Sequence, residues 1–280
     1  GQKVEIPLTV KDAVKDRPLS YNLDVMPVFM RANCNTGSCH GSARGQDGFH
    51  LSLFGFDPRG DHFRLTQELS GRRVNLALPE DSLLVTKSVN SVPHTGGKKM
   101  EVGSPMYNTL VEWVTKGVPY DADDVAKVVG VDIFPKNAVL EGANAKMQFT
   151  ARARYSDGHD RDITPLAVFI TNNEPTAKIS PDGLVTAQKR GEAFIMARFE
   201  TFTVGSQVIV IPDKLEYTRP EFPANNYIDS LVANKLHRLR ILPSEVCDDQ
   251  TFLRRVSIDI AGVLPTEEEY NKFMASQEPN

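Results

Sequence analysis

Apolar residues recur at helical spacing at both ends of the first 125 residues. The stretch 21–32 (YNLDVMPVFMRA) predicts a short helix in spite of one internal proline. The stretch 105–116 has both start and stop signals. Ser104 can cap this helix, Pro105 suits its first turn, and Gly117 can end it in the left-handed conformation. One face of the second helix carries an apolar stripe of Met106, Leu110, Trp113 and Val114.

From residue 126 onward the pattern changes to the alternation of apolar and polar residues that is typical of strands. Residues 147–155 alternate and are followed by Asp157-Gly158, a hairpin-like turn signal. Further short apolar runs follow at roughly ten-residue spacing, separated by turn residues such as Pro181-Asp182-Gly183. Many short strands at this spacing predict a β-sandwich.

A third pattern follows the proline-containing connector at residues 217–224. Residues 227–241 and 248–262 each carry apolar residues at helical spacing, and Gly262 is placed to end the second of these helices. Thr266 is placed to cap a third helix. The pattern therefore predicts a helical C-terminal segment.

The length of 280 residues also favours several domains, because single cores seldom grow beyond about 250 residues. The expected fold class is multidomain: an all-α region over 1–125, an all-β sandwich over 126–213 and a short helical segment over 214–280.

Composition and charge exclude some classes of protein. The chain is 40% hydrophobic and 24% charged, and no stretch approaches the roughly 20 apolar residues of a transmembrane helix. A formal net charge of −4 with scattered Lys and Arg argues against a nucleic-acid partner. The first five residues contain neither a starting methionine nor a hydrophobic signal core, so we expect a chain from which any signal peptide has been removed.

The candidate chemistry is concentrated in residues 33–41 (NCNTGSCHG). Four residues separate Cys34 from Cys39, and His40 follows directly. Two thiols can add to the vinyl groups of a porphyrin, and the adjoining imidazole then becomes the proximal iron ligand. The usual spacer has two residues, so the extra ones would bulge outward. On spacing alone, the cysteines could instead form a small disulfide loop, and zinc is disfavoured because Cys247 is distant.

A helix before the motif, a looped middle and a final helix bearing an aromatic residue are the plan of a class I-like cytochrome c domain. The loop before the final helix offers His94 and Met100 as the sixth ligand, with Met106 as a third candidate. Arg72 and Arg73 could contact the haem propionates, because guanidinium groups match carboxylates in two-point geometry. An ordinary solvated arginine pair is the alternative.

The first region also resembles a known family. Its stretches 33–65, 71–84 and 92–119 resemble the planctomycete-type cytochrome c modules with a widened four-residue spacer, over roughly residues 22–120. In that family the segment that corresponds to Pro93-His94-x-Gly96-Gly97 recurs, which favours His94 as sixth ligand. Ordinary single-haem cytochromes favour Met100, so both remain candidates.

Two further resemblances concern the rest of the chain. The order of the phrases YSDG, DIT, SPDGLVTA and GEAFIMA resembles the group 2 bacterial immunoglobulin-like domain, which usually serves as a spacer or adhesive module in exported proteins. Residues 227–244 and 252–269 resemble the beginning of a planctomycete domain of unknown function. We therefore expect this chain to be part of a longer polypeptide.

The expected function is electron transfer by an exported c-type cytochrome with one covalently bound haem c per chain and redox proteins as partners. Such a protein needs no catalytic residue, because the iron itself changes oxidation state. Thioether attachment of haem takes place outside the cytoplasm, so we expect a periplasmic or cell-surface location. Two alternatives remain: a haem-free structural or adhesion protein with a Cys34–Cys39 disulfide, and a haem enzyme or sensor with an exchangeable sixth ligand.

Overall fold

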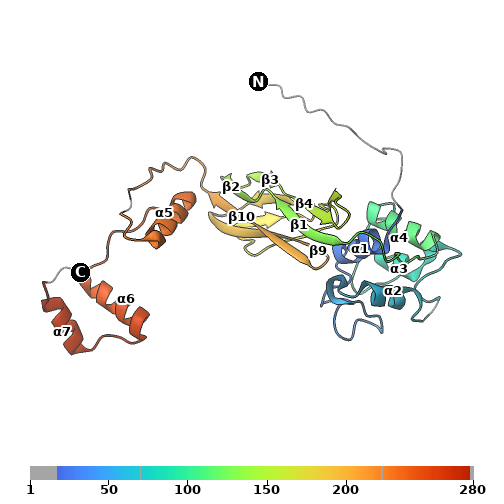
Figure 1. The fold of residues 1–280 in the computed structure, drawn as a ribbon, viewed down its shortest axis with the longest axis horizontal. Coiled ribbons are helices and arrows are strands. Elements are labelled where there is room, and N and C mark those ends of the chain that lie inside the picture. The colour runs from blue at the N-terminus through green and yellow to red at the C-terminus, as the bar shows by residue number, and fades with distance from the viewer. Residues whose placement is uncertain (1–17, 70, 222, 278–280) are drawn as a thin grey trace, which may run out of the picture. The chain divides into compact units, whose positions relative to one another are not determined.

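The computed structural model describes residues 18–69, 71–221 and 223–277 (Figure 1). The chain divides into two compact units, Gly1–Leu215 and Glu216–Asn280. The first unit contains a helical region followed by a β-sandwich, and the second contains helices, so the predicted order of helices, sheets and helices is confirmed. The prediction about a removed signal peptide concerns residues that lie outside this description.

Short helices and long connections make up the helical region. In chain order the elements are η1 (Tyr21–Val25), α1 (Met26–Arg31), η2 (Leu53–Gly55), α2 (Pro58–Thr66), η3 (Pro79–Asp81), α3 (Leu83–Ser88) and α4 (Pro105–Thr115). The predicted first helix is present as the π-helical turn η1 continued by α1. Its Pro27 is tolerated because it lies in the first turn of α1.

Helix α4 has the predicted boundaries. The Ser104 side chain accepts a hydrogen bond from the Tyr107 N–H, and Gly117 adopts the left-handed conformation with φ 83°. Leu110, Trp113 and Val114 are fully buried, as the apolar stripe predicts. They pack against buried residues of η1 and α1, among them Tyr21, Val25, Val28 and Phe29.

The segment after α4 returns to the start of the first helix. The Asp121 carboxylate accepts hydrogen bonds from the Ser20 hydroxyl at 2.8 Å and from the backbone N–H groups of Tyr21 and Asn22 at 2.9 and 2.7 Å. These N–H groups have no acceptor within the helix, so Asp121 caps η1 from a position about 100 residues away in sequence.

The sandwich contains ten strands among the described residues. They are β1 (Val128–Phe134), β2 (Asn137–Glu141), β3 (Lys146–Gln148), β4 (Thr150–Tyr155), β5 (Asp160–Asp162), β6 (Val168–Thr171), β7 (Ala177–Ile179), β8 (Leu184–Ala187), β9 (Gly191–Phe199) and β10 (Phe202–Ile211). They form three sheets with the orders β1-β4-β5, β2-β10-β9-β6 and β3-β8-β7. All pairs are antiparallel except β2 with β10, which are parallel.

Alternation along the strands builds the sandwich core. Ala151, Ala153 and Tyr155 of β4 are buried, whereas the residues between them are exposed. The predicted hairpin signal is confirmed, because the Tyr155 N–H donates to the His159 carbonyl and Gly158 has φ 86°.

The helical region and the sandwich pack directly against each other. Leu23 and Met30 belong to the apolar core of the sandwich. The Arg161 guanidinium donates to the Asp24 carboxylate at 2.9 Å and to the Leu23 carbonyl at 3.1 Å, and Arg31 donates to the Pro165 carbonyl at 3.2 Å. The sandwich therefore supports the first helical segment through a shared core and two arginines.

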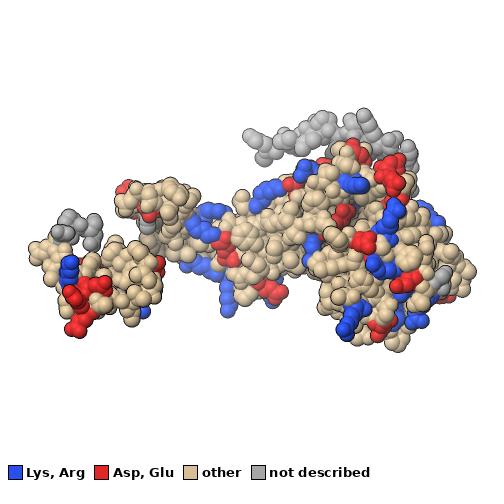
Figure 2. Space-filling model, turned by 60° about the horizontal axis from the view of Figure 1, so that its bottom comes forward, with Lys and Arg blue, Asp and Glu red and all other residues tan. Residues whose placement is uncertain are grey.

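The second unit contains α5 (Tyr227–Leu239), α6 (Asp249–Ala261) and α7 (Glu267–Ala275). The predicted cap at Thr266 and the predicted end at Gly262 are confirmed, the latter by its φ of 73°. Among the described residues, none of the helices is both long and apolar enough to cross a bilayer. On the face drawn in Figure 2, Lys and Arg side chains alternate with Asp and Glu side chains, and neither sign predominates.

Candidate functional site

The C-x4-C-H run forms a tight loop directly after α1. The Cys34 N–H donates to the Phe29 carbonyl at 2.8 Å, and the His40 N–H returns to the Cys34 carbonyl at 3.0 Å. Gly37 and Ser38, in the middle of the spacer, are exposed. Glycine is required at position 41, because a Cβ there would collide with the Asn35 carbonyl oxygen. The loop thus brings His40 back beside the first cysteine while the extra residues lie outward.

The imidazoles of His40 and His94 lie close together and nearly parallel, on separate loops. Their ring centroids are 6.3 Å apart and their planes differ by only 5°. The Nδ1 atom of His40 lies 3.0 Å from the Phe49 carbonyl oxygen, and Nδ1 of His94 lies 3.0 Å from the Gly97 carbonyl oxygen. A carbonyl oxygen can only accept, so each neutral ring carries its proton on Nδ1 and leaves Nε2 free as a metal ligand.

The ring separation fits a single metal ion bound by both imidazoles. A metal ion lies about 2 Å from an imidazole nitrogen, and the ring centroid lies about 1.1 Å behind that nitrogen, so two ligands across one metal ion would have centroids about 6.2 Å apart. The observed centroid separation of 6.3 Å is close to this value. Among the described residues, no three His, Cys, Asp or Glu side chains converge on a metal position. The imidazole pair therefore suits a metal whose remaining ligands come from a cofactor, as in haem.

An apolar cavity contains this pair. His40, His94 and Cys34 line it, together with the apolar side chains of Phe29, Phe49, Leu51, Leu69, Leu83 and Leu84. Polar side chains in the lining are those of Gln46, Asp47, Arg72, Arg73, Lys87 and Ser88. Such a lining suits a largely apolar group that carries a few charged substituents.

Burial changes the acid–base chemistry of the motif. Burial, with a smaller effect from the His94 imidazole, lowers the pKa of His40 below its ordinary value, so its ring is neutral at pH 7. Burial also raises the pKa of the Cys34 thiol to about 12. Cys34, Cys39 and Cys247 are all free thiols in the structure. A neutral imidazole and two free thiols are the groups that covalent haem attachment requires.

The other candidate ligands lie elsewhere. Met100 is only 5% exposed and packs in the apolar core of the helical region, and its backbone N–H donates to the Ser88 carbonyl. Met106 is half-buried against the same core. Met100 and Met106 are not among the residues that line the cavity, so the structure brings His94 rather than either methionine opposite His40.

The two arginines have different surroundings. Arg72 is exposed at the cavity edge. Arg73 is buried, donates to the carbonyls of Arg64 and Glu68 at 2.9 and 2.6 Å, and lies 4.4 Å above the Phe49 ring. The alternative of a solvated pair is therefore wrong for Arg73, because the loop carbonyls and Phe49 surround its guanidinium.

Sequence reasoning did not identify Phe49, and it named Gly96 only as part of the recurring Pro93-His94-x-Gly96-Gly97 segment, without a role. Phe49 supplies the carbonyl for His40, and its ring packs on the imidazole at 4.7 Å. Gly96 allows the loop backbone to approach His94, because a Cβ there would lie 2.9 Å from Cε1 and 3.1 Å from Nε2 of that ring. For Gly96, the sequence signal was the pair of adjacent glycines at 96 and 97, close after His94.

Comparisons with known proteins concern the other parts of the chain. The family model PSCyt2, described as a protein of unknown function (DUF1549), matches residues 227–280, which agrees with the resemblance of this segment to a planctomycete domain of unknown function. No curated protein matches the chain.

Among solved structures, domains 5-6 of the S-layer protein SbsC share 16% identity over 30% of this chain and 44% of that chain, with a TM-score of 0.26. Domains 4 and 5 of the same protein share 14% identity over 30% of this chain and 53% of that chain, with a TM-score of 0.26. The chain thus spans about half of the length of the solved structures that it matches.

Proposed function

We propose that residues 1–125 form a c-type cytochrome domain that binds one haem covalently and transfers electrons. Cys34 and Cys39 are the thioether anchors, His40 is the proximal ligand and His94 is the sixth ligand. The observation that carries this proposal is the parallel His40–His94 pair, with a centroid separation of 6.3 Å and both Nδ1 atoms on backbone carbonyls.

The protein residues hold the ligands and exclude water. The carbonyls of Phe49 and Gly97 fix the orientation and the tautomer of the two imidazoles. The apolar walls keep water away, and Arg72 at the edge is placed to pair with a propionate. Bound haem supplies a one-electron iron couple, and a second histidine gives a lower reduction potential than a methionine would.

Two protein ligands favour electron transfer over the enzyme or sensor alternative. With both His40 and His94 as ligands, a bound haem iron would have no open position for a small ligand. Because thioether attachment takes place outside the cytoplasm, the proposal includes an extracytoplasmic location, and redox proteins are the expected partners.

Absorption spectra of the full chain, expressed with a haem-attachment system, test this proposal. We expect sharp reduced bands that survive denaturation and organic extraction, because the haem is covalently bound. His94→Ala should lose the low-spin spectrum. Met100→Ala should keep it, although the variant should lose about 2–5 kcal/mol of stability because Met100 is buried. His159→Ala, an exposed change in the sandwich, is the control.

The same spectra can contradict each part of the proposal. Loss of the low-spin spectrum in Met100→Ala but not in His94→Ala would assign the sixth ligand to the methionine. Carbon monoxide binding by the reduced wild type would favour a sensor or enzyme. A folded, exported protein without haem and with no reactive thiol at Cys34 or Cys39 would leave the disulfide-containing structural protein.

A further inference from the structure

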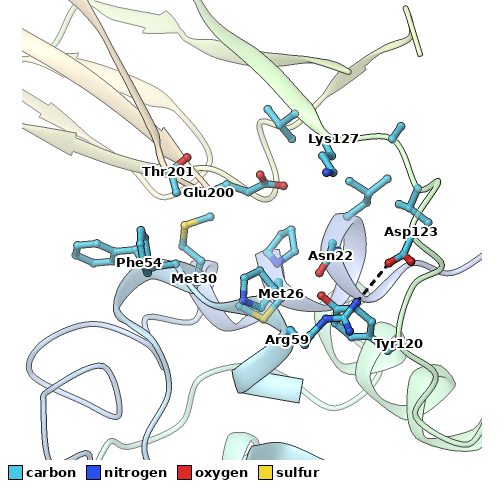
Figure 3. A pocket seen from close by; sticks show the side chains of 18 of the residues that line it. Asn22, Met26, Met30, Phe54, Arg59, Tyr120, Asp123, Lys127, Glu200 and Thr201 are labelled. Atoms are coloured by element: carbon cyan, nitrogen blue, oxygen red, sulfur yellow. Dashed lines mark hydrogen bonds and ion pairs between the residues drawn. The ribbon is translucent and has the colours of Figure 1, made fainter. Parts of the chain in front are cut away.

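A second cavity lies where the helical region meets the sandwich, away from the His40–His94 pair (Figure 3). Its volume is about 380 Å³, within the range of about 300–1,000 Å³ that small-molecule sites occupy. The walls come from η1 and α1, the segment around η2 and α2, the connector after α4 and the β9–β10 turn. Much of the lining is apolar or aromatic, with Met26, Pro27, Met30, Phe54 and Tyr120.

One carboxylic acid faces this cavity without a basic partner. Glu200 lies in the β9–β10 turn, and Figure 3 shows its carboxyl group directed into the cavity. Among the described residues, no hydrogen bond or ion pair involves this side chain. Burial alone raises the pKa of Glu200 to about 7, without a contribution from a neighbouring charge. An uncompensated carboxylate in such surroundings is costly, which makes a bound cation the natural partner.

Two of the cationic side chains nearby contact other groups. Arg59 lies 5.2 Å from the centre of the Tyr120 ring and pairs with Asp123 at 3.4 Å. Arg198, two residues before Glu200, lies 3.7 Å above the Phe54 ring. Lys127 also lines the cavity, and it is exposed. The cavity thus combines an unpartnered carboxyl group with aromatic and thioether walls.

We propose that this cavity binds a small organic cation, an ammonium group attached to an apolar or aromatic body. The ammonium N–H groups would donate to the Glu200 carboxylate, and the positive charge would compensate it. The thioethers of Met26 and Met30 and the Tyr120 ring would contact the body of the ligand. This inference does not rest on haem binding, because Glu200 does not line the haem cavity.

A matched pair of probes tests the charge requirement on the full chain. Isothermal titration at pH 7.5 would compare 2-phenylethylammonium with 2-phenylethanol, which has the same body but a neutral hydroxyl group. We expect the ammonium probe to bind at least tenfold more tightly. Titrations at pH 6.5 in buffers of different ionisation enthalpy should also detect proton release, because the cation favours ionised Glu200.

Variants identify the groups responsible. Glu200→Gln should weaken binding of the ammonium probe at least tenfold and leave binding of the alcohol unchanged. Glu174→Gln, an exposed change in the sandwich, is the matched control. Circular dichroism would check that each variant is folded. Equal affinity of the two probes, no effect of Glu200→Gln, or no binding of the ammonium probe at millimolar concentration would overturn the proposal, whatever the haem content.

Discussion

At the residue scale, two adjacent glycines support His94 in different ways. Gly96 provides space, because a Cβ at this position would lie 2.9 Å from Cε1 of His94. Gly97 allows a left-handed backbone conformation, with φ 71°, that other residues adopt less readily. Space is not the constraint there, because no atom lies within 4 Å of a Cβ built at Gly97. Its carbonyl also accepts the His94 Nδ1 proton.

These two glycines give a matched pair of substitutions. Gly96→Ala should displace the His94 imidazole and reduce the low-spin fraction in the haem-loaded protein, because the new methyl group contacts the ring. Gly97→Ala should cost about 1 kcal/mol of stability through its backbone conformation and retain the low-spin spectrum. Absorption spectra and urea unfolding of both variants would distinguish the two effects. A normal spectrum for Gly96→Ala would contradict the proposed position of His94.

The two motif thiols should differ in reactivity before haem is attached. The thiolate is the nucleophile, and burial raises the pKa of Cys34 to about 12, so Cys34 should react with iodoacetamide more slowly than Cys39 at pH 8. Mass spectrometry of peptides from the haem-free protein would measure both rates. Denaturation in urea should make the rates similar. Equal rates in the folded protein would mean that the Cys34 thiol is accessible.

At the scale of single elements, the sequence predicted those helices that carry both an apolar stripe and a cap. Helix α4 has Ser104, Gly117 and three fully buried side chains, so local pattern and packing agree. Helix α2 was not predicted, because only Asp61 and Leu65 of its residues are buried and no apolar stripe marks it. Strand β5 (Asp160–Asp162) is entirely polar, and β2 is recognisable only through its pairing with β10.

The start of the first helix depends on a distant carboxylate. Asp121→Ala removes the carboxylate that accepts hydrogen bonds from Ser20, Tyr21 and Asn22. The substitution should destabilise the helical region by about 1–3 kcal/mol. Urea unfolding followed by circular dichroism would measure the loss. Asp123→Ala is the control, because Asp123 is exposed and its ion pair with Arg59 should contribute less than about 1 kcal/mol. Equal effects of the two substitutions would exclude a capping role for Asp121.

At the scale of the whole first unit, the sandwich shares its core with the helix that precedes the C-x4-C-H run. Met30 and Leu23 pack into the sandwich core, and the Arg161 guanidinium donates hydrogen bonds to the Asp24 carboxylate and the Leu23 carbonyl. A substitution in the sandwich core should therefore also affect the helical region, which a freely tethered spacer would not do. The resemblance to spacer modules did not predict this contact, because it depends on side chains from separate parts of the sequence.

Glu200 should make the stability of this unit depend on pH. Its folded pKa of about 7 lies above the ordinary value of 4.5, so the folded state retains a proton that the unfolded state releases. The free energy of unfolding should fall by up to about 3 kcal/mol as the pH rises from about 4.5 to 7, and then change no further through this group.

Urea unfolding across this pH range would measure that decrease, and Glu200→Gln should remove it. The other charged groups that line the cavity, Arg59, Asp123 and Lys127, remain in the variant, as does Arg198 on the same hairpin. A pH dependence equal to that of the wild type would assign the effect to groups other than Glu200.

The sequence by itself determined the three-part order of the chain and the strongest helices and strands, and it supplied the residues that we propose to attach a haem. These features are local, since helical spacing, strand alternation, caps and the C-x4-C-H run each lie within a short stretch. The sequence left His94 and Met100 as equal candidates, because both lie in the same loop. The tertiary structure is what favours His94 in our proposal, since Met100 is buried in the core while the Phe49 and Gly97 carbonyls orient the two imidazoles. The cavity around Glu200 is likewise a product of tertiary packing, because distant segments form its walls.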